Sequence, residues 1–287
     1  MLRFGLLVAV GLFSGTALAA PPSIQWVRFD FPPFEINGGP LENRGLVDGE
    51  RRSAQQALPG YRHIDAGPVN EYRLVKLFDA GNYCHGGLIR MPLYEQHAYL
   101  SYITSIMPNK TLITTRRIFQ QKLSGRRDLS FRQVLAMPDL LMGHSTQALG
   151  LELQPVFDAY AKPQQVYFRK GIDHAGLFQM LARQRIDYLI AFPAEAAYWK
   201  RLHPEYDLVA VPLTETRGTF AQGRVACSKN DWGRAVIHEL NQQILRYRLS
   251  SSHLKASTLP WVAPEDRPQY LLDFQRIVGA DHWSNAE

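Results

Sequence analysis

Few residues of this chain stand in a pattern that is typical of catalysis or of metal binding. Residues 143–146 (GHST) come nearest to a nucleophile elbow, but the glycine spacing of that motif is missing. A turn or a helix cap is the better interpretation of this segment. The nine histidines are scattered without the spacing of metal ligands, and no dinucleotide-binding, phosphate-binding or zinc-protease motif occurs. We therefore expect no metal, no cofactor and no enzymatic activity.

The first 19 residues have the pattern of a secretory signal peptide. Arg3 precedes an apolar run at 4–13, and Ala17-Leu18-Ala19 supplies the small residues of a cleavage site. A membrane anchor needs roughly 20 apolar residues, and this run is broken at 14–16. No cysteine lies near the cleavage site, so lipid anchoring is not expected either. We predict export to the periplasm without a membrane anchor.

The predicted compartment bears on whether the two cysteines, Cys84 and Cys227, form a disulfide. In an oxidising environment two cysteines tend to pair, and a bond between them would place both in one lobe. The chain would then have to leave that lobe and return to it. Two separate buried thiols are the alternative; a catalytic cysteine is less expected, because no motif surrounds either residue.

Length and composition set the class of protein. A chain of 287 residues with 46% hydrophobic and 20% charged residues is globular, and its size favours two compact units. The formal charge of +6 favours an anionic neighbour without naming one. The basic pairs 116–117 and 126–127 are expected on a solvated surface. An exported chain of mixed charge without a recognition motif is not expected to bind nucleic acid.

Hydrophobic patterning predicts alternating strands and helices, which is typical of α/β lobes. The first lobe is expected to contain strands at 24–29, 61–66 and 86–91 and helices at 46–58 and 69–80. A second series contains strands at 140–143, 165–168, 186–192 and 207–211 and helices at 148–160, 173–184 and 194–202. Asp173 is a suitable N-cap for one of these helices. A strand at 223–228 and helices at 232–249 and 268–278 complete the chain.

Six short segments occur in an order that resembles a known family. They are 26–34 (WVRFDFPPF), 45–48 (GLVD), Pro92 with Ser101, 143–147 (GHSTQ), 185–187 (RID) and 227–231 (CSKND). The chain is identified by them as a divergent member of the family 3 extracellular solute-binding proteins, which are periplasmic receptors of amino-acid ABC importers. The resemblance implies a periplasmic binding protein-like type II fold, with two α/β lobes joined by two crossing strands. Lobe 1 would comprise residues 20–106 and 213–287, and lobe 2, inserted into it, residues 107–212.

The resemblance also implies a ligand site in the cleft between the lobes. Phe31 corresponds to an aromatic residue that stacks on the ligand, with core packing as the alternative for Phe31 and Phe34. Arg28 falls where a side chain often contacts the ligand. Ser145 and Thr146 fall where a helix N-terminus binds an anion.

Two departures from the family bear on the ligand. Tyr94 stands where amino-acid binders place the arginine that holds the α-carboxylate, and Phe192 stands where they place the aspartate that holds the α-ammonium group. A standard amino acid is therefore not the expected ligand. The cleft would be aromatic, with Tyr188 as a further ring and Arg28 and Arg90 as its charges. The candidate ligand-binding residues are Arg28, Phe31, Arg90, Tyr94, Ser145, Thr146 and Phe192.

Taken together, the sequence predicts a monomeric periplasmic protein that captures a small molecule for an ABC importer or a sensor. Two alternatives stay open. One is an enzyme on the same fold, similar to prephenate or arogenate dehydratases, in which Arg28, Arg90 and Glu95 would act on an anionic ring. The other is a receptor that signals to a membrane partner without transport.

Overall fold

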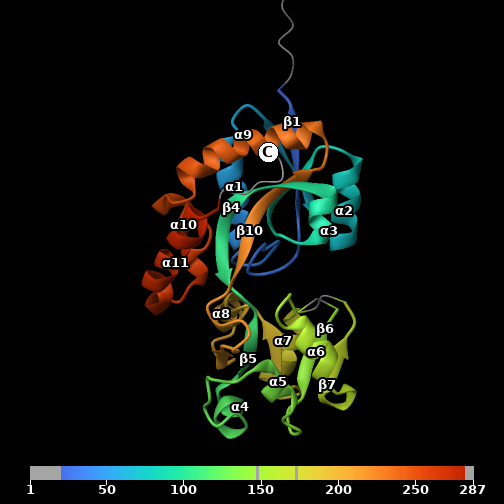
Figure 1. Ribbon diagram of the computed structural model, residues 1–287, viewed down its shortest axis with the longest axis vertical. Helices are drawn as coiled ribbons and strands as arrows, with labels where there is room; N and C mark the ends of the chain where they lie inside the picture. Colours follow the sequence, from blue (N-terminus) through green and yellow to red (C-terminus); the bar gives the residue numbers. More distant parts are fainter. Residues whose placement is uncertain (1–20, 147–148, 172–173, 282–287) are drawn as a thin grey trace, which may run out of the picture.

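The chain forms two α/β lobes that lie one above the other (Figure 1). The computed structural model describes residues 21–146, 149–171 and 174–281. Each lobe has a five-stranded mixed sheet with helices packed against it. This confirms the predicted fold class, a periplasmic binding protein-like type II architecture.

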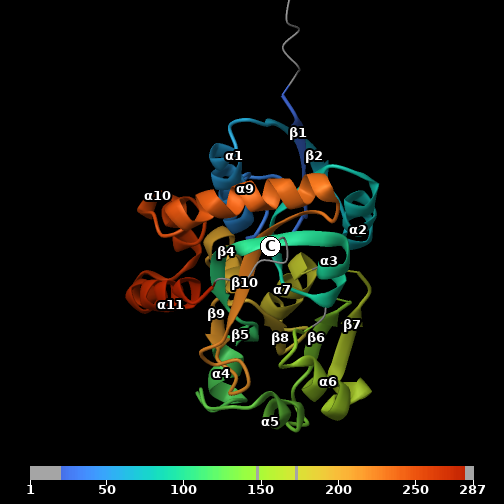
Figure 2. The ribbon, with the colours of Figure 1, turned by 45° about the horizontal axis from the view of Figure 1, so that its top comes forward.

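The sheet of the first lobe has the strand order β2-β1-β3-β10-β4. Strands β1, β2 and β3 are parallel, whereas β10 runs antiparallel to both of its neighbours, β3 and β4. These strands are β1 (Ser23–Arg28), β2 (Arg62–Pro68), β3 (Tyr83–Ile89), β4 (Ala98–Pro108) and β10 (Phe220–Ser228). The helices are α1 (Leu46–Ala57), α2 (Glu71–Ala80), α3 (Pro92–His97), α9 (Asp231–Tyr247), α10 (Ser251–Ala256) and α11 (Arg267–Gly279), with 3-10 turns η2 (Leu259–Trp261) and η3 (Pro264–Asp266). The long helix α9 lies across this lobe (Figure 2).

The sheet of the second lobe has the strand order β7-β6-β8-β5-β9. Strand β6 pairs in parallel with β7 and β8, and β5 runs antiparallel to β8 and β9. The strands are β5 (Thr111–Thr115), β6 (Met142–Ser145), β7 (Val166–Arg169), β8 (Tyr188–Ala191) and β9 (Leu208–Val211). The helices are α4 (Arg116–Gln121), α5 (Phe131–Leu135), α6 (Gln154–Tyr160), α7 (His174–Ala182) and α8 (Pro193–Leu202), with the 3-10 turn η1 (Pro163–Gln165).

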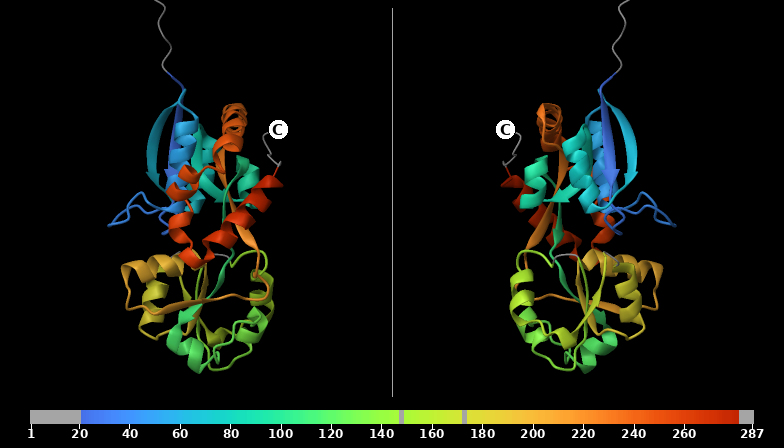
Figure 3. Two further views of the ribbon diagram at one scale, coloured as in Figure 1. Left: turned by 90° about the vertical axis from the view of Figure 1, so that its left-hand side faces the viewer. Right: turned by 90° about the vertical axis from the view of Figure 1, so that its right-hand side faces the viewer.

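Two segments of the chain cross between the lobes, as Figure 3 shows from both sides. The first joins β4 to β5 through Asn109 and Lys110, and the second joins β9 to β10. The first lobe is therefore built from two parts of the chain, one that precedes the second lobe in the sequence and one that follows it. Strand β4 continues to Pro108, past the predicted limit at residue 106. The lobe limits themselves stay a prediction.

Periodicity predicted most of these elements but missed the crossing region. Neither β4 nor β5 was expected from the pattern, because both are buried on both faces and mix apolar residues with threonine and serine instead of alternating. The helix expected from residue 148 begins at Gln154, because Pro155 fits only the first turn and Gly150 has a φ of +100°. Asp173 and the predicted signal peptide at 1–19 lie outside the described residues.

The structure confirms the disulfide between Cys84 and Cys227. The two residues face each other in register on the antiparallel strands β3 and β10, with their Cα atoms 4.1 Å apart. Both are fully buried in the core of the first lobe, beside Trp26, Ile237 and Leu240. The bond thus ties the part of lobe 1 that precedes the second lobe to the part that follows it.

Reduction or a Cys84→Ser substitution should lower the thermal unfolding temperature. The bond closes a segment of 143 residues, for which the chain-entropy model gives at most about 5 kcal/mol of stabilisation. Thermal unfolding of the oxidised wild type, with and without dithiothreitol, measures the effect. An unchanged melting temperature after verified reduction would show that the bond contributes nothing.

A buried carboxyl group lies where α1 packs on the crossing strands. Glu50 is 1% exposed, and its Oε2 accepts a hydrogen bond of 2.7 Å from the Thr104 hydroxyl of β4. There is space for it because Gly87 and Gly223 lack side chains; a Cβ on Gly87 would lie 2.8 Å from Oε2. Burial raises the pKa of Glu50 to about 7, although hydrogen bonds from Ser105 and Thr104 oppose the shift.

Because of this raised pKa, we predict that the free energy of unfolding decreases as the pH rises. The folded chain holds a proton on Glu50 that the unfolded chain releases near its ordinary pKa of 4.5, so stability is full below that value and is lost as the pH rises to about 7. The total loss is about 3 kcal/mol. Urea unfolding between pH 4.5 and pH 7.5 should show this loss for the wild type and not for Glu50→Gln. The exposed Glu42→Gln is the control, and equal profiles for wild type and Glu50→Gln would contradict the prediction.

Candidate functional site

Aromatic rings from the two lobes meet directly. Phe31 and Phe34 lie on the loop after β1, where their rings stack with centroids 4.9 Å apart. The Phe31 ring meets His174 of the second lobe edge-on at 5.3 Å, and the Phe34 ring meets Phe192 in the same way at 5.2 Å. Edge-to-face contacts at these distances are favourable aromatic geometry. The second lobe is therefore in contact with the first through two separate ring pairs.

The loop that carries Phe31 and Phe34 is held by a buried carboxylate. Glu35 is 1% exposed; its Oε2 accepts the backbone N–H of Phe29 at 2.6 Å and lies 3.0 Å from Nε2 of His85 on β3. A backbone bridge between Phe31 and Glu35 closes the loop. Because both ends of the loop are fixed, the two rings point toward the second lobe.

A second buried carboxylate organises the opposite side. Glu195 is fully buried in the first turn of α8, and its Oε1 accepts the N–H of Phe192, the N-cap residue, at 2.9 Å. This is the reciprocal half of a capping box, and Pro193 occupies the first helical position that favours proline. The other oxygen, Oε2, is hydrogen-bonded to Nδ1 of His174. One carboxylate thus fixes both the backbone of Phe192 and the ring of His174.

Lys110 lies on the first crossing segment and completes this group. It is 8% exposed, and its Nζ lies 5.4 Å from the centre of the Phe192 ring, a cation–π distance. Burial lowers its pKa to about 8, while the Glu195 carboxylate acts in the opposite direction. We call the set Phe31, Phe34, Lys110, His174, Phe192 and Glu195 the interlobe cluster.

His144, on β6, adjoins the interlobe cluster. Its ring lies against Phe157 and Phe168, with centroids at 4.7 and 5.9 Å. Burial lowers its pKa, and the positive charges of Lys110 and His174 lower it further. Two of the basic side chains of the interlobe cluster, Lys110 and His174, therefore act on His144.

The lobes are also joined by an apolar contact beside the cluster. The loop at 36–41 and the start of α1 pack on α8 of the second lobe. The buried members are Ile36, Leu41, Leu46, Val47, Met107, Phe192, Ala194, Tyr198 and Trp261. Phe192 belongs to both groups, so it has a packing role as well as a position at the interlobe contact.

The predicted site residues are only partly brought together. Phe31 and Phe192 meet in the interlobe cluster, through Phe34. Ser145 is buried at the end of β6, and Thr146 follows it as an exposed residue in a bend. The expected helix N-terminus at Thr146 is wrong, since α6 begins at Gln154 and has only seven residues.

The other three predicted residues are engaged within the first lobe. Arg28 forms an ion pair of 3.1 Å with Asp65, and Arg90, whose side chain is half exposed, pairs with Glu95 at 2.8 Å. Tyr94 is 6% exposed and donates its hydroxyl to Glu71 at 2.7 Å. Burial, together with the Glu71 carboxylate, raises the pKa of this phenol.

The aromatic cleft predicted from the sequence is therefore corrected in two positions. Tyr94 packs in the hydrophobic core of the first lobe, and Tyr188 packs in that of the second. Neither ring is available to line an aromatic cleft, because each is needed to fill the space between a sheet and its helices.

Sequence reasoning missed Lys110, His174 and Glu195. For Lys110 a signal was present, since it is the only charged residue among residues 98–115. Glu195 stands three residues after Phe192 and two after Pro193, the spacing of a capping box. His174 carried no such signal, because its partner is 21 residues away on another helix.

Solved structures with the same architecture include an amino-acid-binding protein and a sensor domain. An ancestral arginine-binding protein bound to arginine is 14% identical, covers 85% of this chain and 99% of its own, and has a TM-score of 0.61. A histidine kinase sensor domain with similarity to periplasmic binding proteins is 10% identical over 84% of this chain and 96% of its own, with a TM-score of 0.62. The chain has the fold of a periplasmic solute-binding protein.

This solute-binding protein fold also occurs in a protein related to an enzyme. An ancestral amino-acid-binding protein, described as a precursor of cyclohexadienyl dehydratase, is 16% identical over 82% of this chain and 93% of its own, with a TM-score of 0.58. No family model matches the sequence, and no curated protein matches it. At these identities the comparisons establish the fold.

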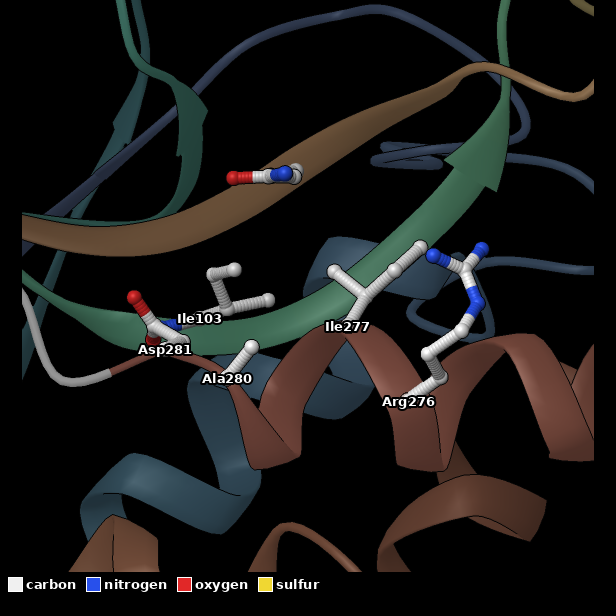
Figure 4. A pocket seen from close by; sticks show the side chains of 6 residues that line it. Ile103, Arg276, Ile277, Ala280 and Asp281 are labelled. Carbon is white, nitrogen blue, oxygen red and sulfur yellow. The ribbon is translucent and has the colours of Figure 1, made fainter.

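The pocket shown in Figure 4 lies apart from the interlobe cluster. It has a volume of about 360 Å³, lies between α11 and the crossing strands β4 and β10, and is lined by Ile103, Gln222, Arg276, Ile277, Ala280 and Asp281. The Asp281 carboxylate is held by Arg224 at 2.9 Å and Arg248 at 3.3 Å. This charge is therefore part of the attachment of α11 to the sheet.

Metal sites and membrane-spanning helices are two further classes of feature. In residues 21–146, 149–171 and 174–281, no group of three or more His, Cys, Asp or Glu side chains could hold a metal ion. In the same part of the chain, the helices are too short or too polar to cross a membrane.

Removal of the Glu195 carboxylate should destabilise the interlobe contact. Glu195→Ala leaves the Phe192 N–H without its acceptor and His174 Nδ1 without its bond to Glu195, and it removes a negative charge that acts on buried Lys110. Loss of one partner from such a buried group costs about 3–5 kcal/mol. Urea unfolding measures this cost, with Glu205→Ala, whose side chain is 67% exposed, as the matched control. Equal stability of the two variants would contradict the role assigned to Glu195.

Proposed function

We propose that the protein is an exported receptor that captures a small molecule between its two lobes. The interlobe cluster carries this proposal, because both lobes contribute side chains to one contact. Ligands that bind better when such a contact is formed shift the equilibrium between open and closed lobes. The fold supports the same conclusion, since its structural neighbours include binding proteins and a sensor domain.

Export to the periplasm is supported by the signal pattern at 1–19 and by the disulfide. We propose that the mature protein is a monomer that delivers its ligand to an inner-membrane ABC importer or reports it to a membrane sensor. We propose no role for a metal ion or a cofactor in this function.

The ligand is proposed to be something other than a standard amino acid. Amino-acid binders of the resembling family hold the α-carboxylate with an arginine at the position of Tyr94 and the α-ammonium group with an aspartate at the position of Phe192. Here the Tyr94 hydroxyl is donated to Glu71, and Phe192 offers a ring. Ligand contacts would come from Phe31 and His174, from the last residues of β6 and from the start of α8. Further contacts would come from Arg28, Arg90, Ser145 and Thr146.

Catalysis on the same fold is the second candidate. The His174–Glu195 pair resembles the orientation of a general base by a carboxylate, and Lys110 has a pKa of about 8. A change in absorbance on addition of prephenate would show dehydration and would replace the receptor proposal with an enzymatic one.

Native mass spectrometry of protein purified gently from the periplasm tests the receptor proposal. We expect a retained small molecule, which is released on denaturation. The protein is then unfolded to release any retained molecule and refolded. Isothermal titration of this refolded protein with the standard amino acids should show no micromolar binding. Micromolar binding of any of them would contradict the proposed ligand class, while the receptor function would stand.

A further inference from the structure

The position of Lys110 bears on the charge of the ligand. Its ammonium group lies 5.4 Å from the centre of the Phe192 ring. Phe192 stands at the position where the resembling family places the aspartate that binds the ligand's ammonium group. A cation of the protein is thus already present beside the position that would hold the cation of an amino acid. This arrangement comes from the chain's own crossing segment, so the cation is part of the fold.

Glu195, the carboxylate of the interlobe cluster, has both of its oxygens engaged. Glu195 is 0% exposed, and its two oxygens accept the Phe192 N–H and bond to His174. It also faces Lys110, whose charge it offsets. At Glu195 a ligand ammonium group would therefore find no free oxygen, and it would lie close to the positive charge of Lys110.

Basic side chains face the same space from several elements. Lys110 comes from the crossing segment, His144 from β6 and His174 from the first turn of α7, and they influence one another electrostatically. On the side of the first lobe, Asp30 is exposed to water and hydrogen-bonded to Asn37. Exposed charges act weakly because water screens them, whereas buried charges act strongly.

We propose that Lys110 is a specificity-determining residue that excludes ligands with an ammonium group, so that the ligand is an organic carboxylate without an α-amino group. The inference rests on the proposed receptor function and names the chemical class of its ligand. Lys110 acts through its charge, and Phe31 offers the partly exposed ring against which the apolar part of such an acid would pack. Charges of like sign brought together in a site are a common means of rejecting the wrong ligand.

Matched ligand pairs test the inference by isothermal titration. The pairs are 3-phenylpropionate with L-phenylalanine and 4-methylpentanoate with L-leucine, which differ only in the α-amino group. At pH 7 we expect each acid to bind at least about tenfold more tightly than the matched amino acid. This is the size of effect expected when one partly screened charge repels the ammonium group. In Lys110→Met this preference should fall to near unity. The control Lys200→Met, an exposed lysine on α8, loses the same net charge and should keep the preference.

The pH dependence of the wild type provides a test that needs no variant. The charge that repels an ammonium group also attracts a carboxylate. Affinity for 3-phenylpropionate should therefore fall about tenfold as the pH rises from 7 to 9, because Lys110 loses its positive charge around a pKa of about 8. Among the described residues, Glu195 and His144 interact electrostatically with Lys110, and His174 is bonded to Glu195; the pKa of His144 is lowered, so His144 is already neutral over this range. A flat profile would overturn the role of Lys110.

Failure of the inference is distinguishable from failure of the proposed function. Binding of an amino acid as tightly as its matched acid overturns the inference and leaves a receptor with another specificity. If no acid binds, the ligand class is wrong. If the same preparation also retains no small molecule in native mass spectrometry, the receptor function is wrong as well.

Discussion

The interlobe contact depends on the buried carboxylate of Glu195. It lies in the first turn of α8, where it caps the helix through the N–H of Phe192, and it holds the ring of His174 on a different helix. The same charge faces Lys110 on the crossing segment. A buried carboxylate is costly unless its oxygens are satisfied, and satisfying them here requires α7, α8 and the crossing segment to take fixed relative positions. The ring contacts with the first lobe follow from those positions.

The first lobe uses the same principle in its own loop. Asp48 is fully buried and accepts the N–H groups of Ile36 and Gly45 at 3.1 and 3.0 Å, while Glu35 accepts that of Phe29. Charged groups fix the backbone of this loop, and aromatic rings make its contacts. The hydrogen-bonded carboxylates provide the rigidity that lets Phe31 and Phe34 present a defined surface to the second lobe.

In the proposed receptor, aromatic contacts and Lys110 stand where amino-acid binders of the resembling family place the charge pairs that hold a zwitterion. Phe192 offers a ring, which satisfies no ligand charge, and the buried Lys110 lies beside it. The two-lobe fold with two crossing segments is thus compatible with more than one interlobe chemistry. Such a separation is expected, because function depends on the site and not on the fold.

The amino-acid sequence by itself determined the alternation of strands and helices, the two-lobe fold and the pairing of Cys84 with Cys227. These features depend on local hydrophobic period, on the order of short motifs and on a count of cysteines in an oxidising compartment. It also predicted Phe31 and Phe192 as site residues, and the structure places both at the contact between the lobes. The tertiary structure decided that Tyr94 and Tyr188 fill cores and that Lys110, His174 and Glu195 meet. These three residues are separated by 21 or more positions on different elements, so their meeting depends on how the second lobe packs around its buried carboxylate, which no local pattern records.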